Sequence, residues 1–191
     1  MKLVSFIMPT RNPWVGLKAA LQSITNTCHD LKGIEILLRI DSDDHERIKW
    51  IPELEIVYGA ECVVGPRGRG YVEMGAFVND LVKIANSYWC WLFDDDAYVE
   101  GDWYTELLKV PINPQDGPAV NAENYVLGES HYKNGPNGGP VGLIVPTAFA
   151  KTLNHRNPVD QLWLDEIKSR GWTIQQLKGV SYYHDGRPRY I

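Results

Sequence analysis

Three adjacent carboxylates, Asp94 to Asp96, directly follow the apolar run YWCWLF at residues 88–93. At partly desolvated separations such carboxylates repel one another by about a kcal/mol or more, so a fold keeps them only where their charge is compensated. A divalent cation can do this, because Mg²⁺ and Mn²⁺ are commonly held by one or two carboxylates together with substrate phosphates. The alternative is a solvated turn or an acidic helix start, and the preceding apolar strand favours the metal and phosphate site.

Three more polar or glycine-rich segments follow apolar runs in the first half of the chain. They are TRN at residues 10–12, DSDD at 41–44 and GPRGRG at 65–70. Open parallel sheets bind ligands in the crevice beyond the carboxyl ends of their strands, where all four segments would meet. The sequence therefore predicts one pocket, both acidic and basic, that is assembled from distant segments.

These polar segments need a sheet to position them, and the apolar patterns predict one. Predicted strands lie at residues 3–8, 34–40, 61–64, 88–93, 173–177 and 180–184, and predicted helices at 14–25, 72–85 and 158–170. The last helix has Asn157 as its N-cap, Pro158 at its first position and Gly171 at its end. Alternating strands and helices indicate an α/β fold with a mostly parallel central sheet flanked by helices. The glycine-rich segment 134–140 is a candidate lid.

The composition excludes several classes of protein. The 191 residues suit one compact domain, and a net charge of −5 without a basic block argues against a nucleic-acid partner. Three widely spaced cysteines indicate reduced thiols in a cytosolic protein. No run approaches the ~18 apolar residues of a membrane span. We therefore expect a soluble cytoplasmic protein with no transmembrane segment.

Four motifs together resemble a known family. They are VSFIMPTRN at the start, LQSI in the first helix, IDSDD after the second strand and WLFDDDAYV after the fourth. Their order and spacing over residues 3–100 resemble the inverting glycosyltransferases of family 2, which have the Rossmann-like GT-A fold. The resemblance implies a nucleotide-sugar donor, Mn²⁺ or Mg²⁺, and single-displacement transfer to a glycan or other hydroxyl acceptor. It divides the single domain, 1–191, into a nucleotide-sugar-binding half, 1–100, and an acceptor-binding half, 101–191.

The resemblance also implies roles for the residues that bind the nucleoside. Pro9, Thr10 and Arg11 match the loop that borders the base and ribose. Asp41 matches the aspartate that accepts a hydrogen bond from the base, commonly uracil, so a UDP-sugar is the expected donor. Ile40 stands where the family often has another aspartate, which leaves the identity of the base open. Residues 41–44 could instead form an ordinary Asx-type turn.

The diphosphate and the metal are assigned to the next two motifs. The glycines of GPRGRG permit a close approach of the backbone, and Arg67 or Arg69 could neutralise a diphosphate by bidentate contacts. The alternative is a solvent-facing loop charge. In the family pattern Asp96 is the principal metal ligand, and Asp94 or Asp95 reaches the ribose.

Inverting transfer also needs a carboxylate that deprotonates the acceptor hydroxyl. In the last predicted helix, Asp160 shares a stripe with Ile167 and should face the protein, whereas Asp165 should face water. The resemblance points to the same residue, because the family has a Glu-Asp pair at the start of a helix that ends in glycine. Val159 replaces the glutamate of that pair. The alternative role for Asp160 is that of a first-turn carboxylate favoured by the helix dipole.

Several further residues are candidates from the second half of the chain. His184 falls where many such enzymes place a histidine ligand for the metal, although a lone histidine is more often structural. Arg187 and Arg189 could fold back onto the diphosphate. Three aromatic residues are placed near the expected acceptor side, where an aromatic face can stack on a sugar: Trp103, Tyr104 and Trp163. The alternative is that most of the aromatic residues belong to the core.

Two other functions remain open at this point. An apolar strand followed by Asp-x-Asp also presents the nucleophile of aspartate-nucleophile phosphatases. That motif normally opens the chain, whereas over ninety residues precede it here, and Tyr98 stands where threonine or valine is expected. The other alternative is a non-catalytic nucleotide-sugar or glycan-binding module that kept the pocket and lost the base.

Overall fold

The computed structural model describes residues 1–11, 14–111, 118–126, 142–156 and 158–184. The strands are β1 (Lys2–Thr10), β2 (Ile34–Asp41), β3 (Ala60–Gly65), β4 (Ser87–Leu92), β5 (Ala97–Glu100), β6 (Ala119–Val126), β7 (Ile144–Pro146) and β8 (Ile174–His184). The helices are α1 (Trp14–Asn26), α2 (His45–Tyr58), α3 (Met74–Ile84), α4 (Trp103–Leu108), α5 (Thr147–Ala150) and α6 (Val159–Ser169). In this part of the chain no helix has both the length and the apolar character needed to cross a membrane.

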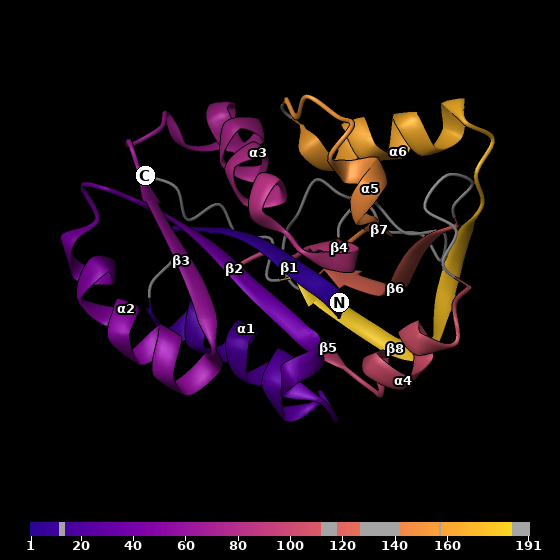
Figure 1. The fold of residues 1–191 in the computed structure, drawn as a ribbon, viewed down its shortest axis with the longest axis horizontal. Helices are drawn as coiled ribbons and strands as arrows, with labels where there is room; N and C mark the ends of the chain where they lie inside the picture. Colours follow the sequence, from indigo (N-terminus) through magenta and orange to yellow (C-terminus); the bar gives the residue numbers. More distant parts are fainter. Residues whose placement is uncertain (12–13, 112–117, 127–141, 157, 185–191) are drawn as a thin grey trace.

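The described strands form one sheet in the order β3-β2-β1-β4-β7-β6-β8-β5 (Figure 1). The pairs β3-β2, β2-β1 and β1-β4 are parallel, so the four predicted polar segments leave the sheet at one edge. Beyond β4 the sheet becomes mixed, and β8 pairs with β6 in parallel and with β5 in antiparallel orientation. The predicted fold, an α/β domain with a mostly parallel sheet flanked by helices, is confirmed.

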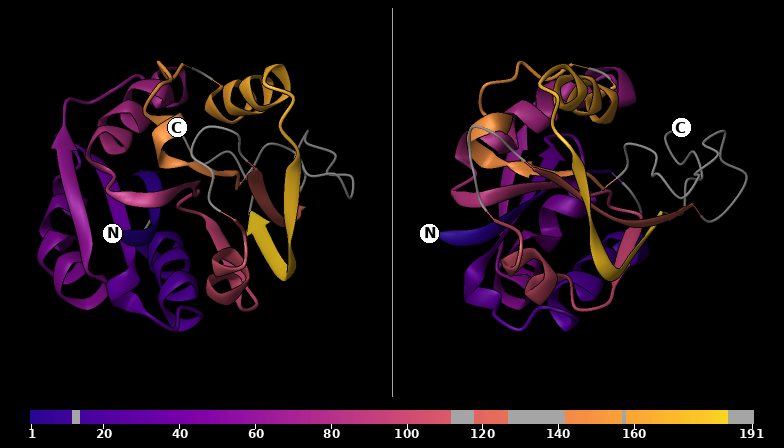
Figure 2. Two further views of the ribbon diagram at one scale, coloured as in Figure 1. Left: turned by 45° about the vertical axis from the view of Figure 1, so that its right-hand side comes forward. Right: turned by 90° about the vertical axis from the view of Figure 1, so that its right-hand side faces the viewer.

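Both faces of the sheet are covered by helices. Figures 1 and 2 show α1, α2 and α4 on one face and α3, α5 and α6 on the other. Because side chains alternate along a strand, β1 directs Phe6 toward the first group and Ile7 toward the second, and each residue belongs to a separate apolar cluster. Burial on both faces explains why the central strands read as continuous apolar runs.

The last strand differs from its prediction in one respect. The sequence indicates two strands at its end, and the structure has one strand, β8, with Gly179 at φ +67° between the two segments. The pairing of β8 with β6 shifts at this point, from Asn121 opposite Gln176 to Glu123 opposite Ser181. The bulge therefore sets the register of the second segment, which ends at His184.

Candidate active site

Asp95 joins the carboxyl ends of β1 and β4. It is 2% exposed, and its Oδ2 accepts hydrogen bonds from Thr10 Oγ1 at 2.6 Å and from the backbone N–H of Arg11 at 2.9 Å. This carboxylate oxygen therefore holds the loop after β1 against the triple aspartate. The sequence suggested Asp94 or Asp95 for the ribose, and the contacts of Asp95 are those of a residue that positions the loop.

Asp94, Asp96 and His184 lie together at the next corner. His184 is the pairing partner of Ala97, and its Nε2 lies 3.1 Å from Asp96 Oδ1 and 4.0 Å from Asp94 Oδ2. The Tyr182 hydroxyl donates to Asp94 Oδ2 at 2.8 Å and accepts from the Asp94 N–H at 3.0 Å. The end of β8 therefore orders the end of β4, although nearly ninety residues separate them in the sequence.

The environment of these groups changes their acidity. Burial is the largest cause that raises the pKa of Asp94; the charge of Asp96 adds to it, and the charge of His184 opposes it. The pKa of Tyr182 is raised well above its usual value by burial and by the charge of Asp94. Tyr182 therefore stays protonated and can donate to Asp94. The sequence analysis assigned no role to this residue.

The donor set fits a divalent cation. Two carboxylates each lie within 4.0 Å of one imidazole, and together they provide the oxygen and nitrogen ligands that suit Mn²⁺ or Mg²⁺. In the ranges that the structure describes, no cluster of three or more His, Cys, Asp or Glu side chains is already arranged as a metal site. Sites that share the cation with substrate phosphates need no such complete cage of protein ligands.

Asp160 lies near the same corner, at the start of α6. Burial, the largest cause, raises the pKa of Asp160, and the charge of His184 lowers it. The charge of Asp160 in turn raises the pKa of Asp94. Its Oδ1 accepts the Gln161 N–H at 3.0 Å. Asp165 is exposed and accepts a hydrogen bond from Gln161 Nε2, so the prediction that it faces water is confirmed.

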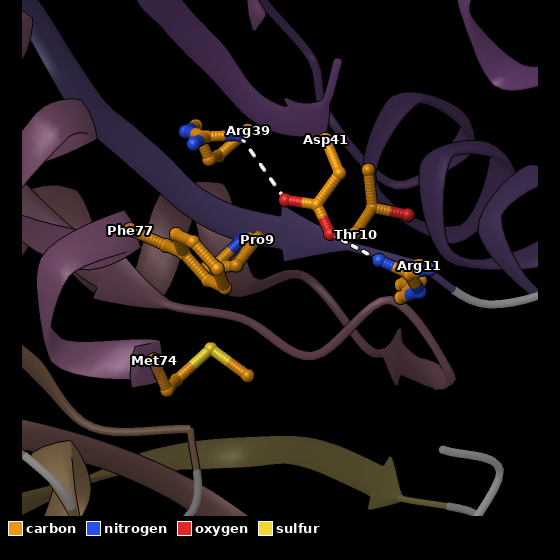
Figure 3. Close-up of a pocket in the computed structure, with 7 residues that line it drawn as sticks. All are labelled: Pro9, Thr10, Arg11, Arg39, Asp41, Met74 and Phe77. Carbon is orange, nitrogen blue, oxygen red and sulfur yellow. Dashed lines mark hydrogen bonds and ion pairs between the residues drawn. The ribbon is translucent and has the colours of Figure 1, made fainter. Parts of the chain in front are cut away.

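A pocket opens where β1 and β2 end, beside α3 (Figure 3). It is lined by Pro9, Thr10, Arg11, Arg39, Asp41, Met74 and Phe77. The structure thus brings together four residues that the sequence analysis assigned to nucleoside binding. It adds Arg39, Met74 and Phe77, of which Arg39 could have been noticed as the charged residue inside an apolar run.

The turn after β2 is held by charge pairs. Arg11 Nη1 bonds Asp41 Oδ2 and lies 3.8 Å from Asp43 Oδ1. The Asp44 N–H donates to the Asp41 carbonyl at 3.0 Å, and the Asp44 carboxylate accepts the Arg47 N–H at the start of α2. Residues 41–44 therefore form a turn, which the sequence analysis gave as an alternative to binding of the base. Asp41 also lines the pocket.

The two arginines of the glycine-rich loop differ in their surroundings. Arg67 Nη1 lies 2.8 Å from Asp43 Oδ2, which places Arg67 close to the pocket. Arg69 is directed toward Glu73, to which its backbone N–H and its Nε donate at 2.8 and 2.9 Å. Of the two, Arg67 is better placed to reach a bound nucleotide.

The glycines of this loop make room for the pocket wall. An added Cβ at Gly65 would lie 2.5 Å from Arg39 Nη2, and one at Gly68 would lie 2.2 Å from Phe77 Cζ. Both distances are too short for atoms in contact, so a side chain at either position would displace a lining residue.

Gly68→Ala is therefore expected to weaken binding of a nucleoside diphosphate about tenfold, because the methyl group pushes Phe77 out of place. Overpacking of this kind costs ~1–3 kcal/mol. Titration calorimetry would measure the affinity. The control is Gly33→Ala, which crowds the Tyr104 hydroxyl at 2.4 Å, away from the pocket. Similar losses of affinity in both variants would contradict the local explanation.

The three aromatic residues belong to the core, which was the alternative to a role in stacking on a sugar. Trp103 and Trp163 are fully buried and Tyr104 is 9% exposed, so none of them offers a face to a sugar. Their helices direct them into the apolar clusters, and Trp103 Nε1 donates to Thr27 Oγ1 at 2.7 Å. The predicted N-cap Asn157, the lid at 134–140, and Arg187 and Arg189 lie outside the described residues.

Asn79 anchors the segment that leads to α6. Its Oδ1 accepts the His155 N–H at 3.1 Å and lies 2.7 Å from His155 Nδ1, and its Nδ2 donates to the His155 carbonyl at 3.1 Å. The segment is packed so closely on α3 that a Cβ at Gly75 would lie 2.6 Å from Arg156 Cα. The start of α6, which carries Asp160, is thus held to α3.

This anchor predicts a loss of stability in acid. Burial lowers the pKa of His155 to about 4, whereas an unfolded histidine titrates near 6.5. Between these pH values the unfolded chain binds a proton that the folded chain does not. Stability should therefore fall as the pH drops from 6.5 toward 4, by about 3 kcal/mol from this residue.

Urea unfolding of the protein and of His155→Gln at several pH values would isolate this contribution, because the other titrating groups are common to both. The difference in unfolding free energy should shrink on acidification. His45→Gln, at an exposed position, is the control and should keep the pH dependence of the wild type. An unchanged pH dependence in His155→Gln would refute the explanation.

Comparisons with known proteins identify the family and the fold. The family model described as glycosyl transferase family 2 matches residues 5–161. No curated protein gives a significant match. The fold is similar to that of S. aureus TarS 1-349 in complex with UDP, with a TM-score of 0.75 at 15% identity over 96% of this chain and 60% of that one.

A second similar structure is the mannosyltransferase PcManGT from Pyrobaculum calidifontis in complex with GDP-Man and Mn²⁺. Its TM-score is 0.69 at 13% identity, over 98% of this chain and 58% of that one. At these identities the likeness shows the fold, and the chain spans about three fifths of the length of either structure. The family model matches well over half of the chain, which therefore belongs to glycosyl transferase family 2.

Proposed function

We propose that the protein transfers a sugar, with inversion, from a nucleoside diphosphate sugar to an acceptor hydroxyl, and that uridine is the nucleoside. One observation carries the proposal. Asp94 and Asp96 after β4, His184 at the end of β8 and Asp160 at the start of α6 lie within electrostatic reach of one another. Family membership supports it, and the similar structures hold UDP, UDP-GlcNAc, or GDP-Man with Mn²⁺.

Asp96, His184 and Asp94 would hold Mn²⁺ or Mg²⁺ at this corner. A bound divalent cation neutralises the charge that develops on the leaving diphosphate. The hydroxyl of Tyr182 fixes the orientation of Asp94 through its hydrogen bond of 2.8 Å. The chain thus supplies an oriented set of ligands on one side of the donor.

Asp160 would act as the base on the other side of the reacting carbon. It takes the proton of the acceptor hydroxyl as that oxygen forms a bond to the anomeric carbon and the bond from this carbon to the diphosphate breaks. The Gln161 N–H bonds this carboxylate, and the segment before α6 is held to α3 through His155 and Asn79. A single displacement of this kind inverts the anomeric configuration.

The nucleoside would occupy the pocket lined by Thr10, Arg11 and Asp41, and Arg67 would approach the diphosphate from the loop after β3. The family match decides against the phosphatase alternative. A binding module without activity differs from an enzyme only in turnover, which the following experiment measures.

The test is the hydrolysis of a panel of nucleotide-sugars, because hydrolysis of the donor requires no known acceptor. We expect release of nucleoside diphosphate from one UDP-sugar with Mn²⁺ and none with EDTA. NMR of the released sugar at early times would report its anomeric configuration. Failure of every nucleotide-sugar to react, together with no binding of any nucleoside diphosphate in the presence of metal, would overturn the proposal.

A further inference from the structure

Arg39 is a charged residue in the interior of the protein. Its side chain is 3% exposed, and it lies in a strand that is otherwise apolar from Ile36 to Ile40. Alternation along β2 puts Leu37, Arg39 and Asp41 on the face covered by α3. Removing a guanidinium from water costs several kcal/mol unless its hydrogen bonds are replaced, so its partners must explain its presence.

The partners of Arg39 come from three elements. Its Nε donates to Asp80 Oδ2 of α3 at 3.2 Å, and its Nη2 donates to the Pro66 carbonyl after β3 at 2.8 Å. Its Nη1 donates to the Ile40 carbonyl at 2.6 Å and to Asp41 Oδ1 at 3.4 Å. The guanidinium also lies 4.8 Å above the centre of the Phe77 ring. Arg39 thus ties together the walls of the pocket.

Asp41 is held between two arginines. Arg11 bonds its Oδ2 and Arg39 bonds its Oδ1, and the side chain of Asp41 is 7% exposed (Figure 3). Each carboxylate oxygen can accept more than one hydrogen bond, so the carboxylate still accepts an N–H from a ligand. The pocket therefore presents an acceptor carboxylate whose orientation is fixed by an arginine on each side.

Part of the lining of the pocket is apolar. Pro9, Met74 and Phe77 supply it (Figure 3); Pro9 is the pairing partner of Arg39, and the Phe77 ring lies against its guanidinium. A flat ring with a polar edge would suit a lining that is apolar in part and charged in part. The imide edge of uracil presents an N–H that this carboxylate can accept, whereas cytosine has a bare acceptor nitrogen at the same position.

We infer that Arg39 is a positioning residue that determines base specificity by fixing Asp41 for the imide edge of the nucleobase. The inference rests on the proposed binding of a nucleoside diphosphate sugar. A purely structural role explains the presence of a buried arginine at this position less well. Replacement of buried ionic groups by apolar side chains of similar volume often leaves stability unchanged or raises it. An apolar residue could supply none of the hydrogen bonds of Arg39, and the bond to Asp41 is the one that reaches the acceptor in the pocket.

The test compares the affinities of UDP and CDP in the presence of Mn²⁺, by titration calorimetry. The wild type should prefer UDP at least tenfold, and Arg39→Met should reduce that preference to within about threefold. Arg39→Lys should also reduce it, because a lysine lacks the planar fork that reaches several acceptors at once. The control is Arg47→Met at the other buried arginine of the described chain, which pairs with Asp44 and should keep the preference.

Asp41→Asn tests whether Arg39 acts through Asp41, and it also serves if Arg39→Met fails to fold. In the Asp41→Asn variant, the further substitution Arg39→Lys should change the preference for UDP over CDP by less than twofold. If Arg39 acts independently of Asp41, Arg39→Lys will lower the preference in this variant as well, and the inference is then overturned. A wild-type preference in a folded Arg39→Met variant would also overturn it.

The same titrations separate this inference from the proposed function. A wild type that binds UDP and CDP equally, or GDP better than UDP, overturns the inference and leaves nucleotide-sugar transfer standing. A wild type that binds no nucleoside diphosphate at all overturns both.

Discussion

Replacement of Asp160 by asparagine is expected to slow sugar transfer by about 10²- to 10⁴-fold, the usual contribution of a positioned general base. An amide cannot take the proton of the acceptor hydroxyl. It keeps the size of the side chain, and its oxygen can still accept the Gln161 N–H that Asp160 accepts at 3.0 Å. The Kd of the donor nucleotide should therefore stay within about twofold. Initial rates of transfer and calorimetry of nucleotide binding would measure the two effects separately.

Asp165→Asn is the matched control for this variant. Asp165 lies on the same helix, is exposed and contacts Gln161, so its loss should leave both the rate and the affinity unchanged. Near-normal transfer by Asp160→Asn would show that Asp160 serves α6 as a first-turn carboxylate and that the base lies elsewhere. A large loss of donor affinity would instead assign Asp160 to the donor site.

The sheet was predictable because its central strands are buried on both faces. Continuous apolar runs that end in Pro9, Asp41 or Asp94 have few other interpretations, and β1, β2 and β4 extend to within two residues of these positions. The helix α2 was missed for a different reason. Its apolar stripe, at Ile48, Ile51, Leu54 and Tyr58, packs on the core, but Ile56 and Val57 on the exposed side make the stripe hard to recognise.

The site was predictable only in part, because much of it depends on pairing between distant strands. The position of His184 depends on the bulge at Gly179 and on its pairing opposite Ala97, which no local pattern encodes. The hydrogen bonds from Arg11 and Arg39 to Asp41 likewise require β1 and β2 to lie side by side. The sequence left the role of Trp163 open, because the helical spacing that directs a residue toward the protein does not distinguish a cleft from the core.

The second prediction with a large effect concerns Asp96. UDP with Mn²⁺ should raise the Tm of the wild type, because a ligand present at 100 times its Kd stabilises the folded state by about 2.7 kcal/mol. For a protein of this size such a gain corresponds to roughly 5–10 °C. Asp96→Ala should remove the gain, because it takes away the carboxylate that lies 3.1 Å from His184 Nε2. Thermal denaturation with and without EDTA would measure it.

Glu100→Ala is the control, because Glu100 is an exposed carboxylate on β5, four residues beyond Asp96, and its loss should leave the gain intact. The comparison separates a specific ligand from a general loss of negative charge at this edge of the sheet. If Asp96→Ala kept the full gain, the cation would have to be held by other residues. The proximity of Asp96, Asp94 and His184 would then reflect only the hydrogen bonding that joins β8 to β4.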